Sequence, residues 1–155
     1  MKKIPSLKLP IINNGEISKH ILSNITANKK VVIFGVPGAF TPTCSEKHLP
    51  SYLNLIGQFK TKGIDDIYCI SVNDAFVMKA WLASYHKGNP IKGIADGNAE
   101  FAKAMNLIAD YSGNFMGKRC KRFALIAECN SIIHLNIEEK GEFLVSSAEH
   151  ILNQI

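Results

Sequence analysis

The residue of this sequence best placed for chemistry is Cys44, a thiol near the predicted start of a helix. The apolar run at residues 31–34 is typical of a strand buried on both faces of a sheet, and Gly35, Pro37 and Gly38 then end it. Unpaired N–H groups and the macrodipole at a helix start favour a thiolate over a thiol, so a reactive sulfur is expected. The alternative is a small apolar residue packed under the helix, because free cysteine is often buried.

Two positions could start that helix. Thr41 can be the N-cap with Pro42 as the first helical residue, or Thr43 can be the N-cap with Glu46 completing a capping box. The pattern leaves both alternatives open. Either of them places Cys44 in the first turn.

The helix itself is predicted by apolar residues that recur at spacings of three and four between residues 49 and 59. Pro50 is expected to kink this helix and Gly63 to close it. His48 lies one turn beyond Cys44. It is either a helper base or metal ligand beside the sulfur, or a hydrogen-bonded, partly buried histidine.

The rest of the chain predicts one α/β domain covering residues 1–155. With 155 residues, 46% of them hydrophobic, the chain can bury one core without disulfide or metal staples. Strands that alternate with helices and end in a hairpin and a helix are typical of a three-layer α/β domain. The expected strands are residues 67–72, 91–95, 123–127 and 132–137, and the expected helices are 75–82, 99–107 and 148–152, with Asn73 or Asp74 and Ser146 or Ser147 as caps.

The N-terminal segment has weaker patterns. Residues 8–13 alternate weakly and contain Pro10, which favours an edge strand or a loop before the turn signal Asn13-Asn14-Gly15. Residues 17–25 carry apolar side chains at helical spacing. They are expected to form a short covering helix.

Charge and cysteine content exclude several classes of function. The net charge of +5 comes from scattered lysines and arginines apart from a basic cluster at residues 117–122, which lacks interleaved aromatics. We therefore expect a solvated face and no nucleic-acid site. The four cysteines lack paired spacing, no apolar stretch is long enough to span a bilayer, and no apolar signal segment is found, so we expect a cytoplasmic protein that does not insert into membranes.

The residues Pro37, Thr41 and Cys44 fit the peroxiredoxin signature PxxxTxxC. The wider segment PGAFTPTCSEKHLP resembles the type II, or fifth-subfamily, peroxiredoxins, and CISVNDAFVMKAW, IADGNAEF, KRFALI and GEFLVSSAEHIL follow in that subfamily's order. The resemblance implies a thioredoxin-like fold with a central mixed sheet flanked by helices on both faces. It also implies a thiol-dependent peroxidase that reduces hydrogen peroxide and alkyl hydroperoxides without a metal or organic cofactor.

The resemblance also implies roles for individual residues. Cys44 is similar to the peroxidatic cysteine, Pro37 and Thr41 to its pocket partners, and Arg122 to the arginine that faces the sulfur. Attack of a thiolate on a peroxide moves charge onto the departing oxygen, which fixed donors around both oxygens would stabilise. Thr41, the N–H groups of residues 43–45 and the Arg122 guanidinium can be such donors, and Pro37 would exclude water. By pattern alone Arg122 is one more charge of the basic cluster.

The step that regenerates the thiol divides this subfamily. Plant-like members have a second cysteine in the strand before VND, and Cys69 occupies that place, so it is either the resolving cysteine or a core residue. The animal-type route is expected to be absent because residues 145–147 hold no cysteine. Cys120 lies between cationic residues, so a lowered pKa is expected there, and Cys129 matches no role.

The implied partners are a hydroperoxide, a reductant and a second copy of the chain. The reductant is glutathione with glutaredoxin, or thioredoxin. The homodimer is expected to use residues 74–78, where Phe76 and Met78 are apolar, unless these two are core residues. Two rival functions use the same fold: a thiol transferase, although the chain has no CxxC at Cys44, and a non-catalytic redox sensor or binding protein that is oxidised once without turnover.

Overall fold

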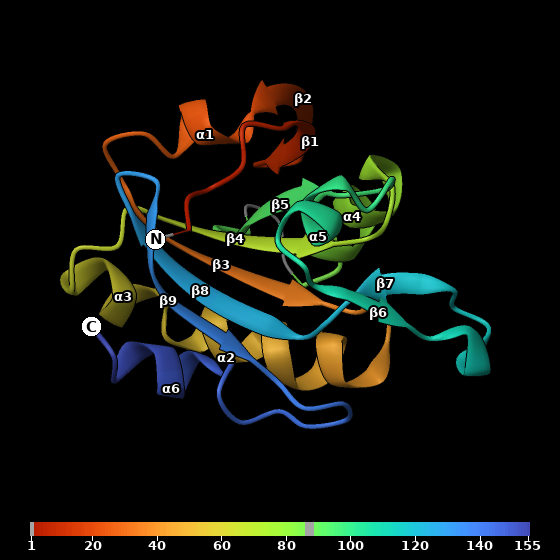
Figure 1. The fold of residues 1–155 in the computed structure, drawn as a ribbon. Coiled ribbons are helices and arrows are strands. Elements are labelled where there is room, and N and C mark those ends of the chain that lie inside the picture. Colours follow the sequence, from red (N-terminus) through yellow and green to blue (C-terminus); the bar gives the residue numbers. More distant parts are fainter. Residues whose placement is uncertain (1, 86–88) are drawn as a thin grey trace.

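The computed structural model describes residues 2–85 and 89–155. Its centre is a seven-stranded sheet in the order β2-β1-β5-β4-β3-β8-β9 (Figure 1). β4 pairs in parallel with β3 and β5, and the other pairs are antiparallel, so the sheet is mixed as expected. The strands are β1 (Lys8–Asn13), β2 (Glu16–Ile21), β3 (Lys30–Val36), β4 (Asp66–Ser71), β5 (Lys92–Ala95), β8 (Phe123–Glu128) and β9 (Ser131–Ile137).

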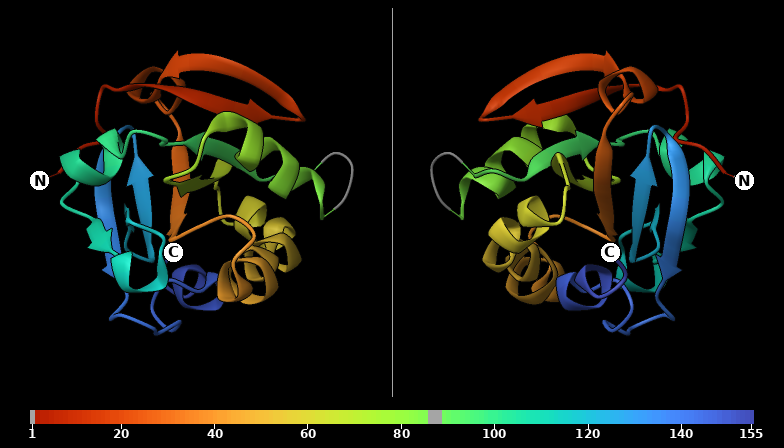
Figure 2. Two further views of the ribbon diagram at one scale, coloured as in Figure 1. Left: turned by 90° about the vertical axis from the view of Figure 1, so that its right-hand side faces the viewer. Right: turned by 90° about the vertical axis from the view of Figure 1, so that its left-hand side faces the viewer.

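Helices cover both faces of this sheet (Figure 2). Successive side chains of a strand point to opposite faces, so β3 contributes Val32 and Phe34 to one hydrophobic core and Val31 and Ile33 to the other. The first core is covered by α2 (Leu49–Asn54), α3 (Ile56–Thr61), α4 (Ala75–Ala83) and α6 (Ala148–Leu152), and the second by α1 (Leu22–Ile25) and α5 (Glu100–Ala104).

A second, two-stranded sheet extends beside the C-terminal end of β3 (Figure 1). It consists of β6 (Ile108–Asp110) and β7 (Lys118–Cys120), joined by a loop that contains the 3-10 turn η2 (Ser112–Asn114). We call residues 108–120 the arm. Within the two described ranges, none of the helices has the length and apolar character needed to cross a membrane.

The N-terminal segment differs from the sequence-based prediction. Asn14 and Gly15 have φ angles of 53° and 80° and form a two-residue loop between β1 and β2, the geometry that short hairpins prefer. Ile17 and Ile21 therefore lie on a strand, and the predicted helix is limited to the four residues of α1. β1 is therefore not an edge strand: it lies between β2 and β5, and β2 is the edge strand at this end of the sheet.

Candidate active site

Strand pairing brings two distant parts of the sequence together at the C-terminal end of β3. β3 and β8 are antiparallel neighbours with Gly35 opposite Phe123, so the end of β3 lies beside the start of β8. Cys44 follows β3, and Arg122 immediately precedes β8. The Phe123 ring occupies the space where a Cβ on Gly35 would lie, so glycine is required for this pairing.

The helix that carries the cysteine begins at Pro42, so the expected start at Thr41 and Pro42 is the observed one. The expected capping box is wrong, because Thr43 is already helical, with φ −65° and ψ −38°. The helix then widens into a π-helical turn, η1 (Cys44–His48).

Pro50 explains the wide turn. It has no N–H to donate, and in a regular helix its ring would collide with the carbonyl group of residue 46. The Leu49 N–H instead donates to the carbonyl oxygen of Cys44. The predicted single helix is divided into η1, α2 and α3, and Gly63 with φ 90° follows its last turn.

The π turn also leaves one carbonyl group for another element to satisfy. In the π pattern the Ser45 carbonyl oxygen would face Pro50, which has no N–H. It accepts a hydrogen bond of 2.8 Å from the Tyr85 hydroxyl, and Trp81 Nε1 donates to Ser45 Oγ at 2.9 Å. Trp81 of α4 and the nearby Tyr85 therefore hold the turn beside the sulfur.

Arg122 contacts the sulfur directly. Its Nη2 donates to Cys44 Sγ at 3.1 Å, and its Nη1 lies 2.9 Å from His48 Nδ1. An arginine side chain only donates hydrogen bonds, so the sulfur is the acceptor, the role that a thiolate fills best. The Cys44 side chain is only 1% exposed.

His48 is fully buried between the rings of Phe34 and Phe143, at centroid distances of 4.9 and 5.0 Å. Its Nε2 lies 3.0 Å from the Ser146 carbonyl oxygen. Because a carbonyl only accepts and arginine only donates, both contacts require a neutral ring with its proton on Nε2. Burial, helped by the charge of Arg122, lowers the pKa of His48 to about 3. The helper-base interpretation is therefore wrong, and both ring nitrogens are bonded within the protein.

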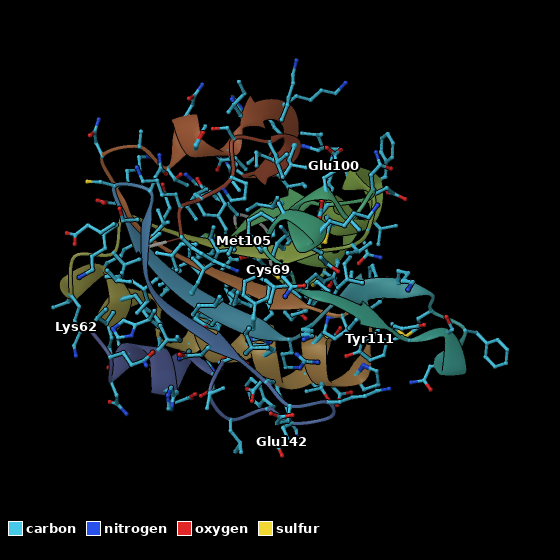
Figure 3. All side chains as sticks on the ribbon, in the orientation of Figure 1. Lys62, Cys69, Glu100, Met105, Tyr111 and Glu142 are labelled. Atoms are coloured by element: carbon cyan, nitrogen blue, oxygen red, sulfur yellow. The ribbon has the colours of Figure 1, made fainter. Side chains whose placement is uncertain are left out.

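A cavity of about 770 Å³ is lined by Arg122, which contacts the sulfur, and by Thr43, the residue before Cys44. It lies between the end of β3, the arm and the loop at residues 138–147, so three segments far apart in the sequence form its walls. Figure 3 shows Tyr111 on the arm and Glu142 on the loop. The cavity is lined by the predicted site residues Pro37, Thr41 and Arg122, together with Thr43, Tyr111 and Glu142 among others.

The donors around this cavity differ in part from those predicted. The Thr41 hydroxyl donates to the Gly38 carbonyl oxygen at 2.7 Å, so its lone pairs are left to accept a hydrogen bond from a ligand. The Ser45 N–H is already bonded to the Thr41 carbonyl oxygen at 2.9 Å. Of the three predicted N–H donors at residues 43–45, those of Thr43 and Cys44 stay available for an oxygen, because they precede this first helical hydrogen bond.

The other cysteines lie in different environments. Cys69 is fully buried in the middle of β4, near the centre of the molecule in Figure 3, and burial raises its pKa well above the usual value. Burial also raises the pKa of Cys120 to about 12, and its Sγ donates to the Val36 carbonyl oxygen at 3.2 Å. The predicted low pKa of Cys120 is wrong, because its side chain points into the core. Cys129 is exposed.

Sequence reasoning did not assign Ser146 and Glu138 to the site. Ser146 was one of two expected caps for the last helix, but Ser147 is the cap, accepting from the His150 N–H at 3.2 Å. Ser146 is fully buried, and its carbonyl oxygen accepts from His48 and from the Tyr52 hydroxyl. No local pattern indicates this, because the partners are far apart in the sequence.

Comparison with known proteins identifies the family. The Redoxin family matches residues 2–152. Peroxiredoxin-2C of Oryza sativa subsp. japonica is 49% identical over 140 residues, covering 90% of this chain and 85% of the relative. The chain belongs to the type II, plant-like peroxiredoxins. This peroxiredoxin is a thiol-dependent peroxidase, as expected from the resemblance.

Solved structures of other peroxiredoxins have the same thioredoxin-like fold. Reduced Prx3 from Vibrio vulnificus, in complex with H2O2, is 44% identical with a TM-score of 0.91, and the match covers 99% of this chain and 96% of that one. The antioxidant protein of Plasmodium falciparum, a 1-Cys peroxiredoxin, is 34% identical with a TM-score of 0.86, covering 97% and 94%.

Proposed function

We propose that Cys44 is the peroxidatic cysteine and that Arg122, Thr41 and Pro37 form its peroxide pocket. The observation that carries this assignment is the 3.1 Å contact between Arg122 Nη2 and Cys44 Sγ. Thr41 and Pro37 line the cavity that leads to this contact. The Vibrio relative was solved with H2O2, which supports the same substrate here, and a cavity of about 770 Å³ also leaves room for an alkyl substituent.

In the proposed reaction, the Cys44 thiolate attacks the nearer peroxide oxygen in line with the O–O bond. The S–O bond forms as the O–O bond breaks, and the electron pair leaves with the far oxygen, which takes a proton to become water or an alcohol. The sulfur is oxidised by two electrons to a sulfenic acid. Arg122 and the N–H groups of Thr43 and Cys44 stabilise the charge that moves onto the oxygens, Thr41 Oγ1 accepts a hydrogen bond from the hydroperoxide O–H, and Pro37 excludes water.

We further propose that an external thiol, glutathione with glutaredoxin or thioredoxin, reduces the sulfenic acid and that Cys69 is a core residue. Cys69 belongs to a central strand, paired with Phe34 of β3 on one side and Gly93 of β5 on the other. A disulfide needs Cα atoms within about 7 Å and suitably directed Cβ atoms. Reaching Cys44 would require its helical turn to unwind and β4 to shift, and opening a central strand is costly. The Plasmodium falciparum relative, described as a 1-Cys peroxiredoxin, supports this choice.

Replacing the second cysteine tests this cycle. Cys69→Ser should retain most of the peroxide turnover with glutathione and glutaredoxin, because the external thiol attacks Cys44 directly. Peroxide consumption should be measured with each reductant in turn, and mass spectrometry should follow protein treated with one equivalent of peroxide. Sulfenic acid or a glutathione adduct at Cys44 is expected. A Cys44–Cys69 disulfide together with lost turnover in Cys69→Ser, but not in the buried-cysteine control Cys120→Ser, would show that Cys69 is the resolving cysteine.

We also propose a homodimer that uses an apolar face beside the cavity. Three segments contribute exposed aromatic side chains to this face: Phe40 is 58%, Phe76 78% and Phe115 99% exposed. The Ala39 N–H donates to Asn73 Oδ1 at 3.0 Å, which joins the segments of Phe40 and Phe76. Gly38 lies against Met116, which brings the arm with Phe115 to the same region. Met78, also expected there, is fully buried. Large exposed aromatic clusters are typical of interfaces.

A charge on this face should separate the dimer. Phe76→Glu places a carboxylate in the first turn of α4, where it favours the helix, so the monomer should stay folded. Sedimentation at micromolar concentration should show a dimer for the wild type and a monomer for Phe76→Glu. Ile133→Glu, at a 45% exposed position on β9, is the matched control and should remain dimeric. A wild type that sediments as a monomer would contradict this proposal.

A further inference from the structure

Glu138 is an acidic side chain buried at the edge of the site, with 7% exposure. Its Oε2 accepts hydrogen bonds from the Leu144 N–H at 2.6 Å, the Ser146 N–H at 2.9 Å and the Ser146 hydroxyl at 2.6 Å. Burial acts to raise the pKa of Glu138, but these hydrogen bonds outweigh it and hold the pKa below its usual value. The carboxylate is therefore charged at neutral pH, and such bonds to a charged acceptor are the strong kind.

The carboxylate bridges two ends of one loop. Glu138 directly follows β9, and Ser146 lies just before α6. The bonds to Oε2 fold residues 138–147 back on themselves and point the Ser146 carbonyl group at the helix that carries Cys44. That carbonyl oxygen accepts from His48 Nε2 at 3.0 Å and from the Tyr52 hydroxyl at 2.7 Å.

The Ser146 carbonyl oxygen also determines which nitrogen of His48 can accept a hydrogen bond from Arg122. With the proton held on Nε2, Nδ1 presents a lone pair, and Arg122 Nη1 lies 2.9 Å from it. A guanidinium is planar, so fixing Nη1 also fixes the direction of Nη2, which donates to Cys44 Sγ. Glu138 acts on the main chain of Arg122 as well, because its N–H donates to the Arg122 carbonyl oxygen at 2.9 Å.

We propose that Glu138 is a positioning residue for the peroxidase reaction, holding the Ser146 carbonyl group against His48 so that the histidine aims Arg122 at the Cys44 sulfur. The inference rests on the proposed roles of Cys44 and Arg122. It adds two members, Glu138 and Ser146, that never contact the sulfur, and it gives His48 a defined task as hydrogen-bond acceptor.

The sign of one measurement separates positioning from simple electrostatics. Glu138→Gln keeps the shape of the side chain and removes a negative charge from the lining of the cavity. By Coulomb's law alone, that removal would favour the thiolate, move the pH midpoint of Cys44 alkylation down and speed the reaction. If the Arg122 guanidinium loses its orientation, the effect is the opposite, because Arg122 no longer stabilises the thiolate or the transition state. We expect the midpoint to move up and the rate constant with H2O2 to fall about tenfold.

Glu149→Gln is the matched control, since it removes the same charge at an exposed residue of α6 that does not line the cavity. It should not slow the reaction, and any shift of the midpoint should be downward. If Glu138→Gln behaves like this control, the proposal is overturned. If Glu138→Gln does not fold, Ser146→Ala provides a second test, because it removes only the hydroxyl donor to Glu138. It should lower the rate constant and raise the midpoint, each by less than is expected for Glu138→Gln. An unchanged rate and midpoint in folded Ser146→Ala would overturn it too.

A double-mutant cycle with His48→Phe tests the order of the contacts. If Glu138 acts through His48, Glu138→Gln should lower the rate constant by less than about a further twofold in the His48→Phe background. The His48 contacts through which Glu138 would act are already missing in that background. Losses that multiply would show general structural damage and reject the positioning role. Arg122→Ala is assayed in parallel: a large loss there beside an unaffected Glu138→Gln would reject this inference alone, whereas an unaffected Arg122→Ala would reject the proposed function.

Discussion

Cys44→Ser should reduce peroxide turnover to the uncatalysed background, a loss of more than about a thousandfold. Serine has nearly the same shape, and its oxygen can still accept the hydrogen bond that Arg122 Nη2 donates to the sulfur at 3.1 Å. Its hydroxyl is almost never an anion at neutral pH, so the nucleophile is lost while the surroundings are kept. A coupled peroxide assay and stopped-flow oxidation measure this loss.

The fold should survive this substitution. The melting temperature of Cys44→Ser should stay close to that of the wild type, because one buried polarizable atom is replaced by a smaller one that can keep its partner. Cys129→Ser, at the exposed cysteine, is the matched control and should retain full turnover. Turnover that persists in Cys44→Ser and disappears in a variant of another cysteine would remove the proposed mechanism.

Arg122→Ala should have the second largest effect, a decrease of about a hundredfold or more in the rate constant with H2O2. The substitution removes the donor at Cys44 Sγ and the permanent charge beside it, and it leaves His48 Nδ1 without its partner. Loss of a neighbouring cation disfavours the thiolate, so the pH midpoint of Cys44 alkylation should move up.

Arg122→Lys should rescue only part of this loss. Lysine keeps the charge, but a single ammonium group cannot reproduce the planar pair of donors that reaches both His48 and the sulfur. Lys118→Ala, which removes an exposed positive charge from the arm, is the control and should change the rate little. An unchanged alkylation profile in Arg122→Ala would mean that the two groups are not neighbours in solution.

The sequence by itself determined the features that depend on residues close together in the chain. The apolar run of β3, the turn after it and the helix start at Pro42 are all read from neighbours, so Cys44 was placed correctly. The cap of α4 is of the same kind, with the Asp74 side chain accepting from the Val77 N–H. Local steric and hydrogen-bonding preferences decide such features, and they are present in any short window of the sequence.

Local patterns failed where two structures share one pattern. Ile17 and Ile21 are spaced as on a helix face, but a strand can carry the same two residues. The positive φ angles of Asn14 and Gly15 closed a hairpin instead, and pairing with β1 decided the outcome. For Cys120 the charged neighbours in the sequence suggested a low pKa, whereas burial of its own side chain raises that pKa to about 12.

Only the tertiary structure decided the electrostatics of the site. Arg122 looks like part of a basic cluster in the sequence, and it reaches Cys44 because β8 runs antiparallel to β3 and starts where β3 ends. His48 could have been a base, but Ser146 and Arg122 occupy its two nitrogens and burial lowers its pKa to about 3. The physical reason is that hydrogen-bond partners and desolvation come from groups that only folding brings within a few ångströms of each other.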